Sequence, residues 1–349
     1  MKRLVYGLVL LGACIASSTK TMAQEKQVAS SRPTTATSSA GVLPGFECST
    51  YFDEQIKTYT FEPDVKVHIN APAAAEFDPR RTTRLVFYAL PNGNTTEQTI
   101  GKQCQPDRDW HFYIQHIGAQ TRRLREIIKN ENLVVAYLEA KCRSWPTWRR
   151  KHEQSGQQII KLIDSVRDHF DTNHTTVDLV AHSGGGSLIF GYVNEVEEIP
   201  PWIRRIVFLD ANYGYSDEQQ HGDKFLAWLR GTPEHYLGVV AYDDRRIRIN
   251  GKLVVGPTGG TWRKSQHMLE RFRQDLKLQT EPRDEYMRHR GLDGRLDITL
   301  ILNPEDKILH TVLVEKNGFI HGLTFAGPYE KQADQLWGPV NYEKWIQPE

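Results

Sequence analysis

Residues 179–190 read LVAHSGGGSLIF, an apolar run that stops at Ala181-His182-Ser183 and passes through three glycines into a second apolar stretch. A buried strand that turns directly into a helix gives this pattern, because glycines allow two backbones to approach closely at the turn. Such a turn lifts the hydroxyl of its serine clear of the sheet. Ser183 is therefore either a nucleophile or part of a structural glycine turn, and the surrounding pattern favours the nucleophile.

Six apolar runs are typical of strands buried on both faces of a parallel sheet. They are residues 84–90, 132–138, 176–182, 205–211, 236–242 and 297–302. Helical spacing alternates with them at residues 115–130, 156–170, 185–199, 221–231 and 265–277. This alternation predicts an α/β fold with a doubly wound, mostly parallel sheet and helices on both faces. The period-two pattern of residues 56–70 predicts an N-terminal antiparallel hairpin at a sheet edge.

The N-terminus, MKRLVYGLVLLGACIASS, places two cations before a short apolar stretch, which is the layout of a secretory signal. We expect residues 1–23 to be a signal peptide, residues 24–45 a disordered Ser/Thr/Pro-rich tether, and residues 46–349 a single domain. The protein is then exported, to the periplasm or the medium. Contact with a membrane is expected only if Cys14, which ends a lipobox-like segment, is lipidated.

Charge and cysteine content narrow the class of function. Lys plus Arg is 44 and Asp plus Glu is 43, so no net field favours nucleic acid or an anionic membrane as partner. No Cys/His spacing is typical of a zinc site, and we expect neither a metal nor an organic cofactor. Cys104 with Cys142 is the first choice for a disulfide, although spacing alone leaves the pairing with Cys48 open.

The strand, serine, glycines and helix around Ser183 together resemble the nucleophile elbow of the α/β-hydrolase superfamily, which includes exported bacterial serine esterases and lipases. The G-x-S-x-G motif matches except that Ala181 replaces the first glycine. The resemblance implies an oxyanion hole made by the Gly184 N–H and a donor from the loop after the third strand. That loop carries Asn92-Gly93-Asn94, whose alternative interpretation is a simple Asn-Gly turn.

The superfamily order of Ser, then Asp or Glu, then His implies a base late in the chain. His321, in KNGFIHGLTF, is the predicted base. His310 is the rival, but residues 298–316 are predicted to form a hairpin that would place it inside a strand. His182 is expected to support the elbow or to contact substrate.

Two aspartates follow predicted strands and compete for the place of the triad acid. Asp244 is preferred because it closely follows the run at 236–242, where most members of the superfamily carry the acid, and Asp210, at the end of RIVFLD, is the alternative. Asp243, Glu305 and Asp306 are minor candidates. The aspartate that is not the acid is expected to cap a helix or bind a loop.

The substrate is less constrained. Trp262 and Trp145 are candidates to stack on substrate, with core packing as the alternative. Arg143, Arg149 and Arg263 could bind a substrate carboxylate, with solvated charge as the alternative. The leading prediction is an exported serine hydrolase that cleaves small-molecule or polymer-linked carboxylic esters through an acyl-enzyme. The alternatives are a peptidase or amidase with the same triad, and a catalytically silent binding protein.

Overall fold

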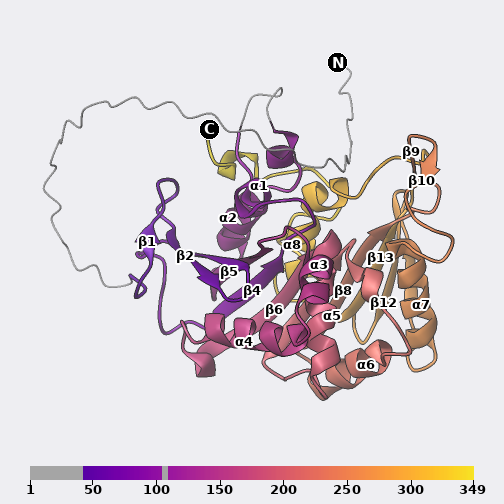
Figure 1. Cartoon of the computed structure of the whole chain (residues 1–349), viewed down its shortest axis with the longest axis horizontal. Coiled ribbons are helices and arrows are strands. Elements are labelled where there is room, and N and C mark those ends of the chain that lie inside the picture. Colours follow the sequence, from indigo (N-terminus) through magenta and orange to yellow (C-terminus); the bar gives the residue numbers. More distant parts are fainter. Residues whose placement is uncertain (1–41, 104–108) are drawn as a thin grey trace, which may run out of the picture.

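The computed structural model describes residues 42–103 and 109–349 (Figure 1). The predicted signal peptide, Cys14, Cys104 and all but the last four residues of the predicted tether lie outside the described residues. Cys48 and Cys142 are exposed free cysteines. Within the described ranges, no helix is both long and apolar enough to cross a membrane.

The described residues build one large mixed sheet with the strand order β1-β2-β3-β5-β4-β6-β7-β8-β13-β12-β11. Its parallel centre comprises β5 (Asn132–Ala140), β4 (Thr83–Ala89), β6 (Thr175–His182), β7 (Ile203–Leu209), β8 (Tyr236–Tyr242) and β13 (Leu296–Ile301). These are the six apolar runs of the sequence. The carboxyl ends of the parallel strands therefore lie along one edge of the sheet, where ligand sites collect in such folds.

Antiparallel strands extend the sheet on both sides. On one side are β1 (Glu47–Cys48), β2 (Gln55–Phe61) and β3 (Val65–Ala71), and on the other β12 (Tyr286–Gly291) and β11 (Gln279–Pro282). The β2–β3 pair is the predicted N-terminal hairpin. A separate small ribbon pairs β9 (Arg248–Ile249) with β10 (Lys252–Leu253).

Helices cover both faces of the sheet (Figure 1). The core on one face includes side chains of α3 (Trp145–Lys151), α4 (Ser155–Arg167), α5 (Gly186–Glu195), α6 (His221–Gly231) and α7 (Thr261–Arg273). The core on the other face includes α2 (Ile117–Ile127) and α8 (Phe319–Thr324), with α1 (Thr96–Ile100) packed beside it. The predicted α/β architecture, a doubly wound and mostly parallel sheet with helices on both faces, is confirmed.

The predicted hairpin of residues 298–316 is wrong in its second half. β13 is paired on one side by β8 and on the other by β12, so neither of its edges can accept a further strand. After β13 the chain leaves the sheet in a loop, which the Asn303 side chain closes. Its Nδ2 donates to the Lys307 carbonyl at 2.8 Å, and its Oδ1 accepts from the Lys307 N–H at 3.0 Å. His310 lies in this loop.

Candidate active site

Ser183 stands on a strained turn between a strand and a helix. β6 ends at His182, a single 3-10 turn spans Ser183–Gly185, and α5 begins at Gly186. The φ angle of Ser183 is 54°, in the left-handed region that a residue with a side chain seldom occupies. Such strain collects at functional sites, and a strand, a tight turn and a helix in this order are the geometry expected of a nucleophile elbow.

The three glycines after Ser183 are required by close backbone contacts. A Cβ on Gly185 would lie 2.2 Å from the carbonyl oxygen of Ala89, and one on Gly186 would lie 1.8 Å from that of Ala211. Side chains at these positions would push the helix away from the ends of β4 and β7. Ala181, which departs from the family motif, is fully buried in β6 and fits the core there.

His310 and Asp210 form a hydrogen-bonded pair at the same edge of the sheet. Asp210 directly follows β7 and is fully buried, and its Oδ2 lies 2.5 Å from Nδ1 of His310. The His310 side chain is 26% exposed, so it joins a buried carboxylate to the surface of the protein. A carboxylate on Nδ1 leaves Nε2 as the nitrogen that can exchange a proton with a substrate or a nucleophile.

His182 connects the elbow to the His310 loop. Its Nε2 donates to the main-chain oxygen of His310 at 2.9 Å, and the two rings are 4.6 Å apart. Burial, followed by the nearby His310, lowers the pKa of His182 well below its ordinary value, so the ring is neutral. His182 is 1% exposed and does not line the cavity at Ser183. The prediction that it supports the elbow therefore fits the structure, and its assignment to substrate binding is corrected.

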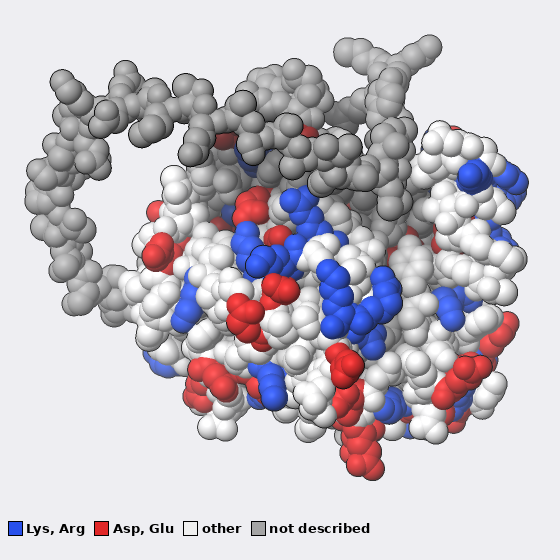
Figure 2. Space-filling view, viewed as in Figure 1, with Lys and Arg blue, Asp and Glu red and all other residues white. Residues whose placement is uncertain are grey.

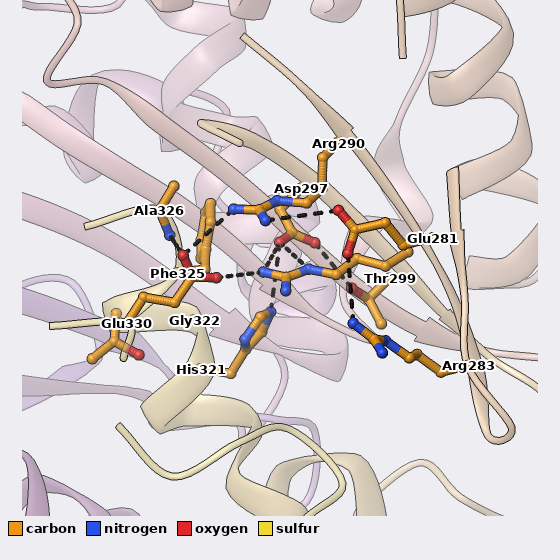
Figure 3. A network of polar contacts seen from close by, with 12 residues as sticks. Glu281, Arg283, Arg290, Asp297, Thr299, His321, Gly322, Phe325, Ala326 and Glu330 are labelled. Atoms are coloured by element: carbon orange, nitrogen blue, oxygen red, sulfur yellow. Dashed lines mark hydrogen bonds and ion pairs between the residues drawn. The ribbon is translucent and has the colours of Figure 1, made fainter. Parts of the chain in front are cut away.

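His321, the predicted base, lies in another part of the molecule. It sits on α8 with Nε2 at 4.0 Å from Asp297, in a polar cluster that also holds Arg290 and Glu330 (Figure 3). It lines a different cavity from that of Ser183. Burial lowers the pKa of His321 to about 4. The expectation that His321 lies with Ser183 is wrong, because the loop after β13 places His310 against His182 of the turn, whereas His321 lies farther along the chain on α8.

Asp244, the preferred acid, is buried but does not contact His310. Its Oδ2 accepts from the main-chain N–H of Thr261 at 2.9 Å, which caps the first turn of α7. The Thr261 hydroxyl donates to Oδ1 of Asp210, so one threonine bridges the two aspartates. Asp210 is thus the aspartate that holds the histidine, and the preference for Asp244 is corrected. Asp244 has instead the helix-capping role expected of the other aspartate.

The minor acid candidates are engaged elsewhere. Asp243 pairs with Arg245 at 2.7 Å, Asp306 pairs with Arg246 at 2.9 Å, and Glu305 pairs with Lys307. None of the three contacts His310 in the part of the chain that the structure describes.

Of the three predicted oxyanion residues in the loop after β4, only Asn92 lines the Ser183 cavity. The Asn92 side chain lies against Gly184, where a Cβ would be 2.1 Å from Asn92 Oδ1, and both residues line the Ser183 cavity. The Gly93 N–H instead donates to the Arg143 carbonyl at 2.9 Å. Asn94 is 4% exposed and does not line this cavity. Gly184 and Asn92 remain candidates, whereas Gly93 and Asn94 are corrected.

Neither predicted aromatic platform faces the cavity. Trp145 is 1% exposed, donates from Nε1 to the Leu138 carbonyl at 3.2 Å and packs edge to face on Trp148. Trp262 is 9% exposed and belongs to the same core cluster. Their assignment to substrate binding is corrected to core packing. The aromatic side chains that do line the cavity are Phe190, which belongs to the core, and Tyr213, which is exposed, and no sequence signal marked either of them.

The cavity above Ser183 has a volume of about 580 Å³, within the usual range for small-molecule sites. Within the described ranges, no group of three or more His, Cys, Asp or Glu side chains could hold a metal ion.

A mostly parallel sheet covered on both faces, a serine on a strained strand-to-helix turn, and a His–Asp pair that follows later strands together define a fold of α/β-hydrolase type. No family model matches the chain, and no curated protein is similar to it by sequence. The solved structures similar to it include several esterases.

A thermostable esterase has a TM-score of 0.45 and 12% identity, over 81% of this chain and 64% of that one. The chain therefore spans less than two thirds of that esterase. Siderophore hydrolase EstB from Aspergillus nidulans has a TM-score of 0.39 and 9% identity, over 78% and 95% of the two chains. The esterase Est2 from Thermogutta terrifontis has a TM-score of 0.38 and 14% identity, over 82% and 97%. Because these values are low, the activity has to be inferred from the residues of this chain.

Proposed function

We propose that this chain is a serine hydrolase that cleaves carboxylic esters, with Ser183 as nucleophile, His310 as base and Asp210 as acid. The observation that carries the proposal is the buried Asp210 carboxylate bound to Nδ1 of a partly exposed histidine beside the elbow. The strained φ of Ser183 supports it, since a purely structural turn has no need of a serine in that conformation. The signal-like residues 1–23 support export.

In this mechanism Ser183 Oγ attacks the ester carbonyl carbon while His310 Nε2 accepts the hydroxyl proton. Asp210 holds the imidazole in the required tautomer and stabilises the imidazolium that forms. The tetrahedral intermediate collapses as His310 returns the proton to the leaving alcohol, which produces an acyl-enzyme. A water molecule, activated by His310 in the same way, then releases the acid and restores Ser183.

The oxyanion that forms in each step needs donors already in place. The Gly184 N–H lies in the first turn after β6, where main-chain N–H groups have no intrahelical acceptor. We assign the second donor to the side-chain amide of Asn92, which lies against Gly184. Donors fixed in this way are worth more than the same groups in water, because they need no reorganisation during the reaction.

Labelling with a fluorophosphonate probe tests the nucleophile. The wild-type protein should be labelled and Ser183→Ala should not. Ser165→Ala is the matched control, because that serine lies on α4, donates to the Leu162 carbonyl and does not line the Ser183 cavity, and it should be labelled like wild type. Labelling that persists in Ser183→Ala would exclude Ser183, and no labelling of any protein would favour the silent binding protein.

Esterase and amidase activities are separated by paired substrates with one acyl group. The wild type should hydrolyse p-nitrophenyl butyrate and leave the corresponding p-nitroanilide almost untouched. Faster cleavage of the anilide, still dependent on Ser183, would replace the ester proposal with an amidase that uses the same residues.

A further inference from the structure

The cavity above Ser183 carries a single charged side chain among its described lining residues, that of Arg149. Arg149 lies on α3, is half-buried, and donates from Nη1 to the main-chain oxygen of Ser187 at 3.1 Å and to its hydroxyl at 3.4 Å. Ser187 is four residues beyond Ser183, about 6–8 Å along a helical axis. A cation therefore stands roughly one helical turn from the nucleophile, in the same cavity.

Arg149 differs from the other arginines that the fold removes from water. Arg84, Arg122 and Arg125 each bind a carboxylate, at 2.5, 2.8 and 2.7 Å. Arg205 is held by main-chain carbonyls and two aromatic rings. Arg149 likewise has no carboxylate partner among the described residues, and its buried Nε, like that of Arg205, has no hydrogen-bond acceptor there. Unlike Arg205, Arg149 lines the cavity of Ser183.

Arg149 therefore has guanidinium N–H groups that are free to donate. Its charge has also lost hydration on burial, and no counterion in the described part of the chain offsets the cost. Burial lowers the pKa of Arg149, although a guanidinium stays protonated at any physiological pH. A planar carboxylate is the group that best matches the donor fork of a guanidinium. A ligand carboxylate in the cavity would supply the missing partner.

Basic side chains also lie around the cavity, with acidic side chains beside them (Figure 2). Figure 2 shows Lys and Arg side chains gathered over the part of this face where α3 lies. The exposed Arg143, Arg150 and Lys151 form no ion pair within the described part of the chain. Their summed field attracts anions toward the cavity mouth.

We propose that the Ser183 cavity is specific for esters that also carry a carboxylate, which Arg149 binds about one helical turn from the scissile carbonyl. This inference rests on the proposed esterase function and specifies its substrate class. Half-esters of short dicarboxylic acids, whose linker spans that distance, are the simplest members of the class.

Monomethyl glutarate and dimethyl glutarate form the matched substrate pair, because they have the same carbon chain and differ at one end. That end is a charged carboxylate in the first and a neutral methyl ester in the second. At pH 8 the wild type should hydrolyse the monomethyl ester to glutarate and methanol with a kcat/KM about 10- to 100-fold above that of the dimethyl ester. Arg149→Met should abolish this ratio and Arg149→Lys should keep part of it. Arg150→Met should change the ratio by less than about twofold, because Arg150 is exposed and does not line the cavity.

If Arg149→Met does not fold, competitive inhibition of wild-type dimethyl ester hydrolysis by glutarate provides the second measurement, and inhibition should weaken in Arg149→Lys. A wild type that prefers the dimethyl ester, or an Arg149→Met variant that keeps the ratio, would overturn the inference while the esterase proposal stands. An equal loss in Arg150→Met would assign the effect to the general field and also overturn it. Absence of both ester hydrolysis and Ser183-dependent labelling would instead refute the proposed function.

Discussion

Asp210 Oδ2 and His310 Nδ1 lie 2.5 Å apart although 100 residues separate them in the chain. The carboxylate follows β7 and the imidazole follows β13, and the two strands lie on either side of β8 in the sheet. The pair keeps the chain order Ser, Asp, His of the α/β-hydrolase superfamily. The proposed base, His310, lies in the loop after β13, and the proposed acid, Asp210, lies in the loop after β7. Variants of His310 and Asp210 test this assignment directly.

The first prediction concerns the base. His310→Ala should lower kcat for ester hydrolysis by about 10⁴-fold or more, since the proton of Ser183 then has no acceptor. His321→Gln should keep kcat within about threefold, because His321 lies in another cavity. Steady-state kinetics on p-nitrophenyl butyrate measure both. The reverse order of losses would restore His321 as the base.

The second prediction concerns the acid. Asp210→Asn should lower kcat by roughly 10⁴-fold, because an amide cannot hold the required tautomer of His310 or stabilise its positive charge. Asp244→Asn should retain most of the activity, since its amide oxygen can still accept from the Thr261 N–H. Kinetics of the two variants at one pH are sufficient, and a large loss in Asp244→Asn alone would contradict the assignment.

The third prediction concerns stability against pH. Burial, followed by the negative charge of Asp210, raises the pKa of Asp244 from 3.8 to about 6. A carboxyl with a raised pKa favours the folded state most when it is protonated, so its contribution is complete below about pH 4 and is lost as the pH rises through 6. Asp244→Asn should therefore be as stable as wild type near pH 4 and on the order of 2–3 kcal/mol more stable at pH 8.

Urea unfolding at several pH values measures this difference. Asp243→Asn is the matched control, because burial raises the pKa of Asp243 but its hydrogen bonds with Arg245 outweigh burial and lower it overall. Its stabilising contribution is present at neutral pH and lost on acidification, so this variant should lose stability relative to wild type at pH 8. A stability gap between Asp244→Asn and wild type that does not change with pH would contradict the raised pKa of Asp244.

The fourth prediction concerns the oxyanion hole. Asn92→Ala should lower kcat by about 10²- to 10³-fold with little change in KM, because the donor acts on the transition state more than on bound substrate. Asn92→Asp keeps the shape but removes the amide donor, and it should lose at least as much. Full activity in both variants would exclude the side chain of Asn92 as a donor.

The fifth prediction concerns the elbow. Gly186→Ala should destabilise the fold by about 1–3 kcal/mol or more, because its Cβ would meet the Ala211 carbonyl at 1.8 Å. Gly256→Ala is the matched control, since a Cβ there meets nothing within 4 Å, and it should leave the melting temperature nearly unchanged. Thermal unfolding distinguishes the two, and equal melting temperatures would show that the elbow can shift to admit a side chain.

The errors in the predicted site have a common origin. His310 and His321 both follow an apolar run late in the chain, and the local pattern around His310 is that of a strand. What excluded the strand was β12, which pairs with the free edge of β13 although its own sequence, YMRHRG, is polar and gives no strong strand signal. In the same way, Trp145 and Trp262 are placed in the core by the packing of α3 and α7, which no local signal reveals.

The sequence by itself determined the doubly wound sheet, the edge hairpin and the position of the strand-to-helix turn at Ser183. The spacing of apolar residues, the length of each apolar run and the glycines at a tight turn are all local properties of the chain. The tertiary structure decided which histidine and which aspartate meet, which tryptophans are buried and which arginine lines the Ser183 cavity. Those outcomes depend on how strand-end loops from β7, β8 and β13 pack together, and such contacts are set by the pairing of distant strands.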